Sequence, residues 1–374
     1  MYSDLFYKLA LHFTPGITYG AVQQLLDFFG TPEAIFHASQ QQLHDAGLRA
    51  DAAARIGSKR TCQKVEKELD FLDKHQISCT FCTDDAYPER LRQCSDAPIV
   101  LFSKGQTDFN VPFVLSIVGK RDCTPYGTDF CKRLVADLAE RLSPLLIVSG
   151  MARGIDICAH RAALANGLQT AAVFGTSFET IYPPQHRKDA EEIMAHGALL
   201  SEMSSDIPTS RIGFVRRNRI IAGLADATVV VESALKGGSL ITADMASSYN
   251  REVFAIPGRA DDLKSEGCNW LIRTCRAHLI TNADQLLDIM GWEQARNEQA
   301  KQRIKDEKRI FAAHCSEDEG KVLAFLQQAG GTASCDEMRN ALKLSDPNML
   351  PIALLSLEIA DMIRGLPGQR YALD

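Results

Sequence analysis

The sequence lacks the segments that would send a protein into or across a membrane. No uninterrupted apolar run in the 374 residues reaches the roughly 20 residues that span a bilayer. The amino terminus carries no basic-plus-apolar signal segment. The 11 cysteines are scattered through apolar stretches and form no compact disulfide framework, which is typical of reduced thiols in a cytosol. We therefore expect a cytoplasmic protein with no membrane partner.

The glycine and histidine signatures of several enzyme classes are also missing. The chain has neither Gly-x-Gly-x-x-Gly nor Gly-x-x-x-x-Gly-Lys-Ser/Thr, which hold dinucleotides and nucleoside triphosphates. It has no nucleophile elbow and no His-Glu-x-x-His helix. Cys79 and Cys82 form a Cys-x-x-Cys pair, but the strand-like alternation around them sends positions three apart to opposite faces. We therefore expect no catalytic residue, no cofactor and no metal.

Acidic residues are absent between Ile207 and Asp226, although the whole chain has a net charge of -6. This interval instead holds Arg211, Phe214, Arg216, Arg217 and Arg219. Arginine beside an aromatic ring can neutralise phosphates and offers a base a flat face on which to stack. An acidic body is compatible with one locally basic groove. The interval therefore predicts a nucleic-acid strand as the ligand.

The pattern of the chain predicts three domains and a linker. Residues 1–75 read as helices with Gly and Pro breaks, typical of a small sterile-alpha-motif or helix-hairpin-helix domain. Residues 76–290 alternate buried strands with helices, which indicates an α/β fold with a doubly wound, mostly parallel sheet. Residues 291–314 form a charged linker, and residues 315–374 predict a winged-helix-like domain of three helices and a hairpin.

The middle region should gather its ligand-binding loops at one edge of the sheet. We expect strands at residues 113–118, 145–149, 170–174, 198–202, 228–231, 252–256 and 277–280. Loops with arginine, lysine and glycine follow several of them, at residues 118–121, 149–156, 174–177, 211–219 and 232–242. Ligands of such sheets collect at the carboxyl ends of the strands, so these loops predict an anion-binding trough. We interpret the strand-end residues Glu202 and Glu232 as partners of nearby arginines, in preference to hydrolase acids.

The turn after the second of these strands has the composition of an anion site. Gly150 and Gly154 allow the backbone to turn tightly and to approach a ligand. Free amides at the start of the next helix would attract an anion, and Arg153 would add a charge-assisted contact. Asp156 is expected to brace the turn.

Six segments in one order carry a resemblance to a known family. They are Val118-Gly-x-Arg121, Ser149-Gly-x-Ala-Arg-Gly-Ile-Asp156, Tyr182-Pro183, Phe214-x-x-Arg-Asn-Arg219, Gly238-Ser-Leu-Ile-Thr-Ala243 and Pro257-Gly258. In order and spacing the chain closely resembles the DNA-processing protein A family (DprA, also called Smf). The resemblance implies an extended Rossmann-type domain that binds single-stranded DNA and forms a homodimer. It also implies transfer of the strand to the RecA recombinase in natural transformation, with single-strand-binding protein displaced or retained.

The resemblance also implies the DNA-binding residues, position by position. They are Arg121, Gly150, Arg153, Gly154, Arg211, Phe214, Arg217, Asn218, Arg219 and Lys236. Arg121 and Lys236 would contact phosphates, and Phe214 would contact a base. One of Arg217 and Arg219 is expected to hold the fold together by pairing with a carboxylate.

Three functions remain open at this point. The first is a non-enzymatic protein that binds single-stranded DNA and loads a recombinase. The second is a nucleotide phosphoribohydrolase of the lysine-decarboxylase-like kind, although Lys236-Gly-Gly-Ser-Leu-Ile-Thr242 lacks the proline and the later glycine of its Pro-Gly-Gly-x-Gly-Thr pattern. The third is a scaffold whose end domains bind proteins. The acidic Glu317–Glu319 stretch favours such a protein-contact role for the winged-helix-like domain.

Overall fold

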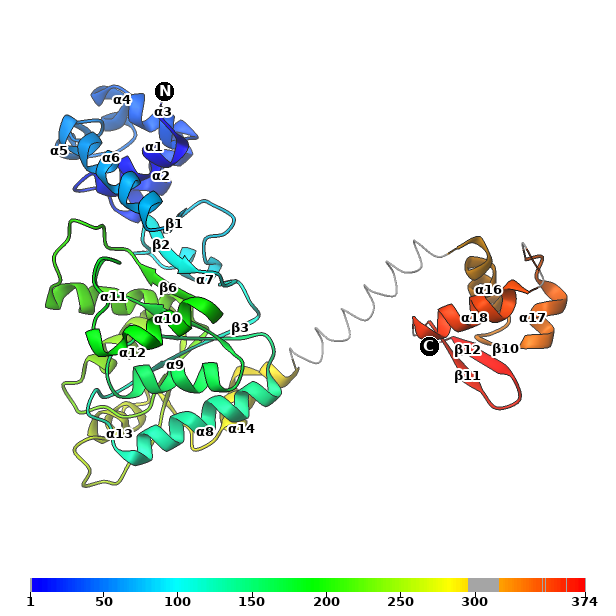
Figure 1. Ribbon diagram of the computed structural model, residues 1–374. Helices are drawn as coiled ribbons and strands as arrows, with labels where there is room; N and C mark the ends of the chain where they lie inside the picture. The colour runs from blue at the N-terminus through cyan, green and yellow to red at the C-terminus, as the bar shows by residue number, and fades with distance from the viewer. Residues whose placement is uncertain (1, 295–315, 345, 347, 361, 374) are drawn as a thin grey trace. The chain divides into compact units, whose positions relative to one another are not determined.

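The computed structural model describes residues 2–294, 316–344, 346, 348–360 and 362–373 (Figure 1). The chain forms two compact units, Met1–Met290 and Gly291–Asp374. Most of the predicted charged linker, residues 291–314, lies outside the described residues. Among the described residues, no helix is both long enough and apolar enough to cross a membrane.

Residues 2–75 are helical. The helices are α1 (Asp4–Phe13), α2 (Tyr19–Phe29), α3 (Pro32–His37), α4 (Gln40–Asp45), α5 (Ala50–Ala53) and α6 (Lys59–Lys74). All but α5 begin after a Ser or Thr whose side chain accepts a backbone N–H of the first turn, which satisfies one otherwise unpaired donor. Their apolar side chains join the same core as part of the sheet, so this region is packed against the rest of its unit.

Residues 78–279 contribute a nine-stranded sheet in the order β1-β2-β6-β5-β4-β3-β7-β8-β9. The strands are β1 (Ser78–Phe81), β2 (Val100–Gly105), β3 (Phe113–Val118), β4 (Leu145–Ser149), β5 (Gln169–Val173), β6 (Ala198–Ser201), β7 (Ala227–Val230), β8 (Glu252–Ala255) and β9 (His278–Leu279). The pairings β1–β2 and β2–β6 are antiparallel, and all the others are parallel. The predicted mostly parallel α/β fold is therefore confirmed.

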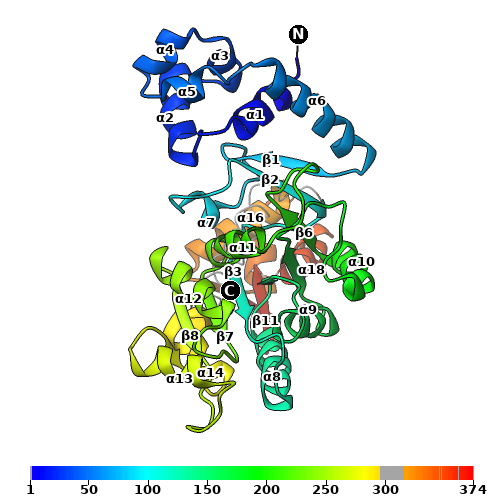
Figure 2. The ribbon, with the colours of Figure 1, turned by 90° about the vertical axis from the view of Figure 1, so that its left-hand side faces the viewer.

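Helices cover both faces of this sheet (Figure 2). One face packs against α9 (Ile155–Ala165) and α10 (Arg187–His196), with α8 (Pro125–Arg141) beside α9. The other packs against α11 (Arg211–Leu224) and α12 (Gly238–Ser248). Short helices α7 (Glu89–Arg92), α13 (Glu266–Arg273) and α14 (Ala283–Met290), and the 3-10 turn η1 (Pro184–His186), complete the unit. From β3 the chain moves outward along the sheet through β4 and β5 to β6, and it then returns to β7 on the other side of β3 and continues to β8. The direction of winding therefore changes between β3 and β7, and ligands are expected there.

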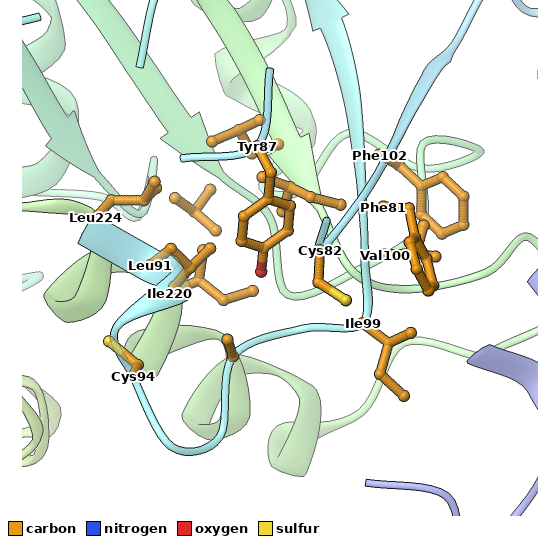
Figure 3. Close-up of a cluster of buried hydrophobic side chains, with 14 of the residues drawn as sticks. Phe81, Cys82, Tyr87, Leu91, Cys94, Ile99, Val100, Phe102, Ile220 and Leu224 are labelled. Carbon is orange, nitrogen blue, oxygen red and sulfur yellow. The ribbon is translucent and has the colours of Figure 1, made fainter. Parts of the chain in front are cut away.

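One side of α11 packs against the segment between β1 and β2 (Figure 3). Tyr87, Leu91 and Cys94 lie in one buried cluster with Ile220 and Leu224 of α11. The Tyr87 hydroxyl donates to the carbonyl of Pro98 at 2.6 Å, so its one polar group is satisfied inside the protein. This packing fixes the position of the helix that carries the arginine run.

The second unit has three helices and a small antiparallel sheet within its described residues. They are α16 (Glu317–Gln328), β10 (Thr332–Ser334), α17 (Cys335–Ala341), α18 (Met349–Ile359), β11 (Ile363–Leu366) and β12 (Arg370–Leu373). The predicted capping box is present, because Ser334 and Glu337 each accept the other's backbone N–H. The predicted carboxyl-terminal hairpin is β11–β12, and β10 adds a strand that the sequence pattern did not indicate.

Candidate functional site

A cavity of about 730 Å³ opens at the carboxyl edge of the parallel strands. Its walls come from the loops after β3, β4 and β7, from the start of α11 and from Tyr182. The predicted convergence of loops at this edge is therefore observed, except that residues 174–177 are buried and do not line the cavity. The cavity lies beside β3 and β7, where the direction of the connections changes.

The cavity collects part of the predicted DNA-binding set. It is lined by Arg121, Arg211, Phe214, Arg217, Asn218 and Lys236. It is not lined by Gly150, Arg153, Gly154 or Arg219. Arg153 is exposed on the loop before α9, and the other three make structural contacts that are described below.

Three exposed cations surround the opening. Arg121 follows β3, Arg211 begins α11 and Lys236 follows β7. Within the described part of the chain, none of the three forms an ion pair, and Asp122 beside them is paired with Lys264 at 2.9 Å. We call Arg121, Arg211 and Lys236, together with the ring of Phe214, the rim. Because no described carboxylate forms an ion pair with a rim cation, the field of these cations is available to an anionic ligand.

Phe214 is held with its ring against the cavity. The ring and backbone of Phe214 pack on Gly175, where an added Cβ would lie 2.7 Å from the ring atom Cδ1. The Tyr182 ring lies beside it, with centroids 5.1 Å apart and planes tilted by 44°. Tyr182 is 45% exposed, so the pair presents aromatic surface next to the cations. The sequence indicates Tyr182 only as part of the Tyr182-Pro183 motif, because its contact with Phe214 joins residues that are more than 30 positions apart.

Arg217 points into the protein. It is only 4% exposed and donates to the carbonyls of Gly150, at 2.6 Å, and Val173. A Cβ on Gly150 would lie within 2.6 Å of the guanidinium, so this glycine makes room for the arginine. Burial lowers the pKa of Arg217 to about 10, and the nearby Asp156 carboxylate partly opposes that effect. Arg217 therefore joins α11 to the ends of two strands while it remains charged at neutral pH.

Arg219 is also buried, on another side of α11. Its guanidinium donates to a carboxylate oxygen of Glu202 and to the carbonyl of Asp96. Glu202 is itself buried, and its second oxygen lies 3.2 Å from the Nε of the exposed Arg216. The expectation that an arginine of this run holds the fold through a carboxylate is confirmed for Arg219.

Glu232 behaves differently from the prediction. Its carboxylate accepts the backbone N–H of Thr124 at 2.8 Å and the Thr124 hydroxyl, so it fixes the start of α8. The predicted pairing with an arginine is therefore wrong at this position. The first turn of α8 gains a rigid attachment to the end of β7 because both groups are buried or half-buried.

The turn before α9 satisfies its own polar groups. Asp156 is buried and accepts the Ala152 N–H at 3.3 Å, which confirms the predicted brace. Burial raises the pKa of Asp156, and Arg217 and the backbone donors act against that rise. Gly154 has φ +80°, and a Cβ there would lie 2.2 Å from the Lys120 carbonyl oxygen. Ile155 donates its N–H to that carbonyl at 3.3 Å, so part of the predicted anion-binding amide set is already used internally.

Comparison with known proteins places this arrangement in a family. Residues 78–291 match the family described as DNA recombination-mediator protein A. Protein Smf of Escherichia coli K12 is 37% identical over 253 residues, which are 67% of each chain. The DNA processing protein DprA of Streptococcus pneumoniae R6 is 39% identical over 204 residues, 54% of this chain and 71% of that protein.

Two solved structures share the fold. The X-ray structure of DprA from Streptococcus pneumoniae has a TM-score of 0.65 and 31% identity, and it covers 77% of this chain and 98% of that chain. The structure of DNA processing protein A from Helicobacter pylori has a TM-score of 0.52 and 30% identity, and it covers 57% of this chain and 95% of that chain. The Helicobacter protein is described as having a unique mode of binding single-stranded DNA.

Proposed function

Because the chain belongs to the DNA recombination-mediator protein A family, we propose that it binds single-stranded DNA along the rim. The observation that carries the proposal is the set of three exposed cations that line one cavity beside Phe214 and form no ion pair among the described residues. Cations that track a backbone and an aromatic ring that stacks on bases give affinity with little sequence readout. The single-stranded DNA binding described for the Helicobacter relative supports the same ligand.

The cations and the aromatic ring of the rim have different roles in the proposed binding. Arg121, Arg211 and Lys236 contact phosphates, since each exposes a cation at the opening. Phe214 stacks on a base, and Tyr182 extends the aromatic surface. Because binding releases counterions, the logarithm of the binding constant falls with the logarithm of the salt concentration, with a slope of about -0.7 per neutralised phosphate on a single strand. Three phosphate contacts therefore give a slope of about -2.

The remaining predicted residues act from behind the rim. Arg217 and Arg219 fix α11 from within, and Asn218 accepts a hydrogen bond from the Nε of Arg217 at 3.2 Å while it lines the cavity. Gly150 and Gly154 allow the close approaches that this packing needs. Arg153 adds positive charge outside the cavity lining.

We also propose that the bound strand is passed to the RecA recombinase, that the chain acts as a homodimer and that it works in the cytoplasm. The family is described as a recombination mediator, and its relatives are named as DNA-processing proteins, which supports a role in delivering DNA to recombination. A binding role is preferred to that of a phosphoribohydrolase, because the carboxylates that line the cavity, Asp122 and Asp156, are engaged with Lys264 and Ala152.

The test is a salt titration of binding to a short fluorescent oligonucleotide, followed by anisotropy. Arg121→Ala/Arg211→Ala should bind more weakly and show a smaller salt slope, by about 1.4 for two lost phosphate contacts. The matched control is Lys132→Ala/Arg133→Ala, which removes the same charge from exposed positions on α8 outside the cavity lining. Equal affinities and slopes for the wild type and the rim variant would overturn the proposal.

A further inference from the structure

Helix α6 of the amino-terminal region holds the segment that leads into α11. This lead segment comprises residues 203–210, between β6 and α11. Glu68 of α6 is buried, and both of its carboxylate oxygens lie 3.1 Å from the backbone nitrogen of Ser205. The Ser205 hydroxyl donates to the same carboxylate at 2.6 Å. A charged acceptor that receives two donors of one residue is a strong and directional attachment.

A second contact of α6 holds the next residue of the lead segment. The Nζ of Lys64 lies 3.2 Å from the Oδ1 of Asp206, and it also lies 4.6 Å from the ring centroid of Phe13 in α1. The Ser204 hydroxyl donates to Asp206 at 2.6 Å. Two successive residues of the lead segment are thus tied to one helix face, because Lys64 and Glu68 lie one helical turn apart.

The end of the lead segment sets the position of the rim. Ser210 caps α11 by accepting the Gly213 N–H at 3.1 Å, and Arg211 is the first residue of the helix. From Asp206 to Ser210 the segment is exposed, so little packing holds it on its outer side. Ser205 and Asp206 are thus the attachments of the lead segment to α6 before the chain enters α11 at Arg211, three residues before Phe214.

We propose that Glu68 is a positioning residue for single-stranded DNA binding, acting through Ser205 on Arg211 and Phe214. This inference rests on the proposed function of the rim. When the attachment is lost, the lead segment samples other positions, and the apparent Kd rises by the reciprocal of the fraction that remains in the binding-competent arrangement. The amino-terminal helices thereby contribute to DNA binding without a contact to the strand.

The variants Glu68→Gln and Ser205→Ala test this role against a matched control. Asp189→Asn serves as the control, because Asp189 is also a buried helix carboxylate that receives two donors of one residue, Arg161 of α9, at 2.6 and 3.0 Å. Asp189 belongs to α10, on the face of the sheet opposite α11, and does not line the cavity. Loss of this carboxylate should perturb stability without moving the lead segment.

Glu68→Gln should raise the Kd for an oligonucleotide about tenfold, which corresponds to about 1.4 kcal/mol, and Ser205→Ala should raise it roughly threefold. The Asp189→Asn control should stay within about twofold of the wild type. The double variant should bind no more weakly than Glu68→Gln, since both changes break one attachment. Hydrogen exchange should accelerate at the amides of residues 205–213 in Glu68→Gln and remain at wild-type rates there in the control.

The outcomes separate this inference from the function on which it rests. If the rim variant Arg121→Ala/Arg211→Ala binds as the wild type does, the proposed function fails and the positioning role fails with it. If the rim variant loses affinity while Glu68→Gln and Ser205→Ala both bind within about twofold of the wild type, the positioning role alone is refuted. Should Glu68→Gln fail to fold, Ser205→Ala decides, because it removes one hydroxyl from a half-buried loop position.

Discussion

Two arginines of the same helix should respond in opposite ways to the same substitution. Arg219 is buried beside Glu202, whereas Arg211 is exposed and unpaired within the described residues. Removing one partner of a buried ion pair costs about 3–5 kcal/mol, because the other charge stays buried without compensation. Since Arg216 still lies 3.2 Å from Glu202, we expect Arg219→Met to lower the free energy of unfolding by about 3 kcal/mol, the lower end of that range. Arg211→Met should change it by less than about 0.5 kcal/mol.

The assay combines denaturant unfolding with oligonucleotide binding on the same two variants. Arg219→Met should unfold at a clearly lower urea concentration with an unchanged m-value, and its salt slope of binding should equal that of the wild type. Arg211→Met should unfold like the wild type and should lose about 0.7 of the salt slope. A wild-type unfolding midpoint for Arg219→Met, together with a reduced slope, would show that Arg219 contacts phosphate and would refute its assignment as a buried brace.

Three further changes probe the ring, the turn and a buried histidine. Phe214→Ala should weaken oligonucleotide binding by about 1–3 kcal/mol if the ring stacks on a base, and unchanged anisotropy curves would contradict stacking. Gly154→Ala should lower the free energy of unfolding by more than Gly167→Ala does. Both glycines have positive φ (+80° and +69°), but only the new Cβ at position 154 would lie close to another atom, 2.2 Å from the Lys120 carbonyl oxygen. Equal denaturation midpoints would remove the argument from that contact. Burial lowers the pKa of His160 from 6.5 to about 3. The folded protein therefore holds His160 neutral, and its contribution to the free energy of unfolding is complete above about pH 6.5. This contribution is lost as the pH falls toward 3, by up to about 1.4 kcal/mol per pH unit. His160→Asn should flatten that part of the stability profile, and a profile as steep as that of the wild type would exclude His160 as its source.

The parallel part of the sheet could be predicted because its strands are buried on both faces. The expected strands at residues 113–118 and 145–149 agree with β3 and β4 at both ends. Each is a continuous apolar run, and the change in composition at its ends marks where the strand begins and ends. Strand β2 was not predicted. It pairs antiparallel with β1 and with β6, so its place depends on partners that are distant in the sequence.

The candidate site could be predicted as a set of loops but not as a set of side-chain directions. Gathering Arg121, Arg211 and Lys236 at one opening follows from parallel topology alone. The inward direction of Arg217 and Arg219 does not, because α11 is covered by the sheet on one side and by the segment between β1 and β2 on another. Charge composition cannot distinguish a guanidinium that meets solvent from one that meets a buried carbonyl or carboxylate.

The absence of acidic residues around α11 therefore has two separate physical consequences. Inside the protein, Arg217 and Arg219 obtain their partners from other elements, namely strand-end carbonyls and Glu202, so these contacts fix the helix to the sheet. Outside, the first turn of α11 has no acidic residue, although carboxylates are favoured at that end of a helix. A carboxylate there would pair with Arg211 and oppose a phosphate. Its absence leaves the positive end of the helix and the Arg211 guanidinium acting in the same direction, toward the cavity that Arg121 and Lys236 also face.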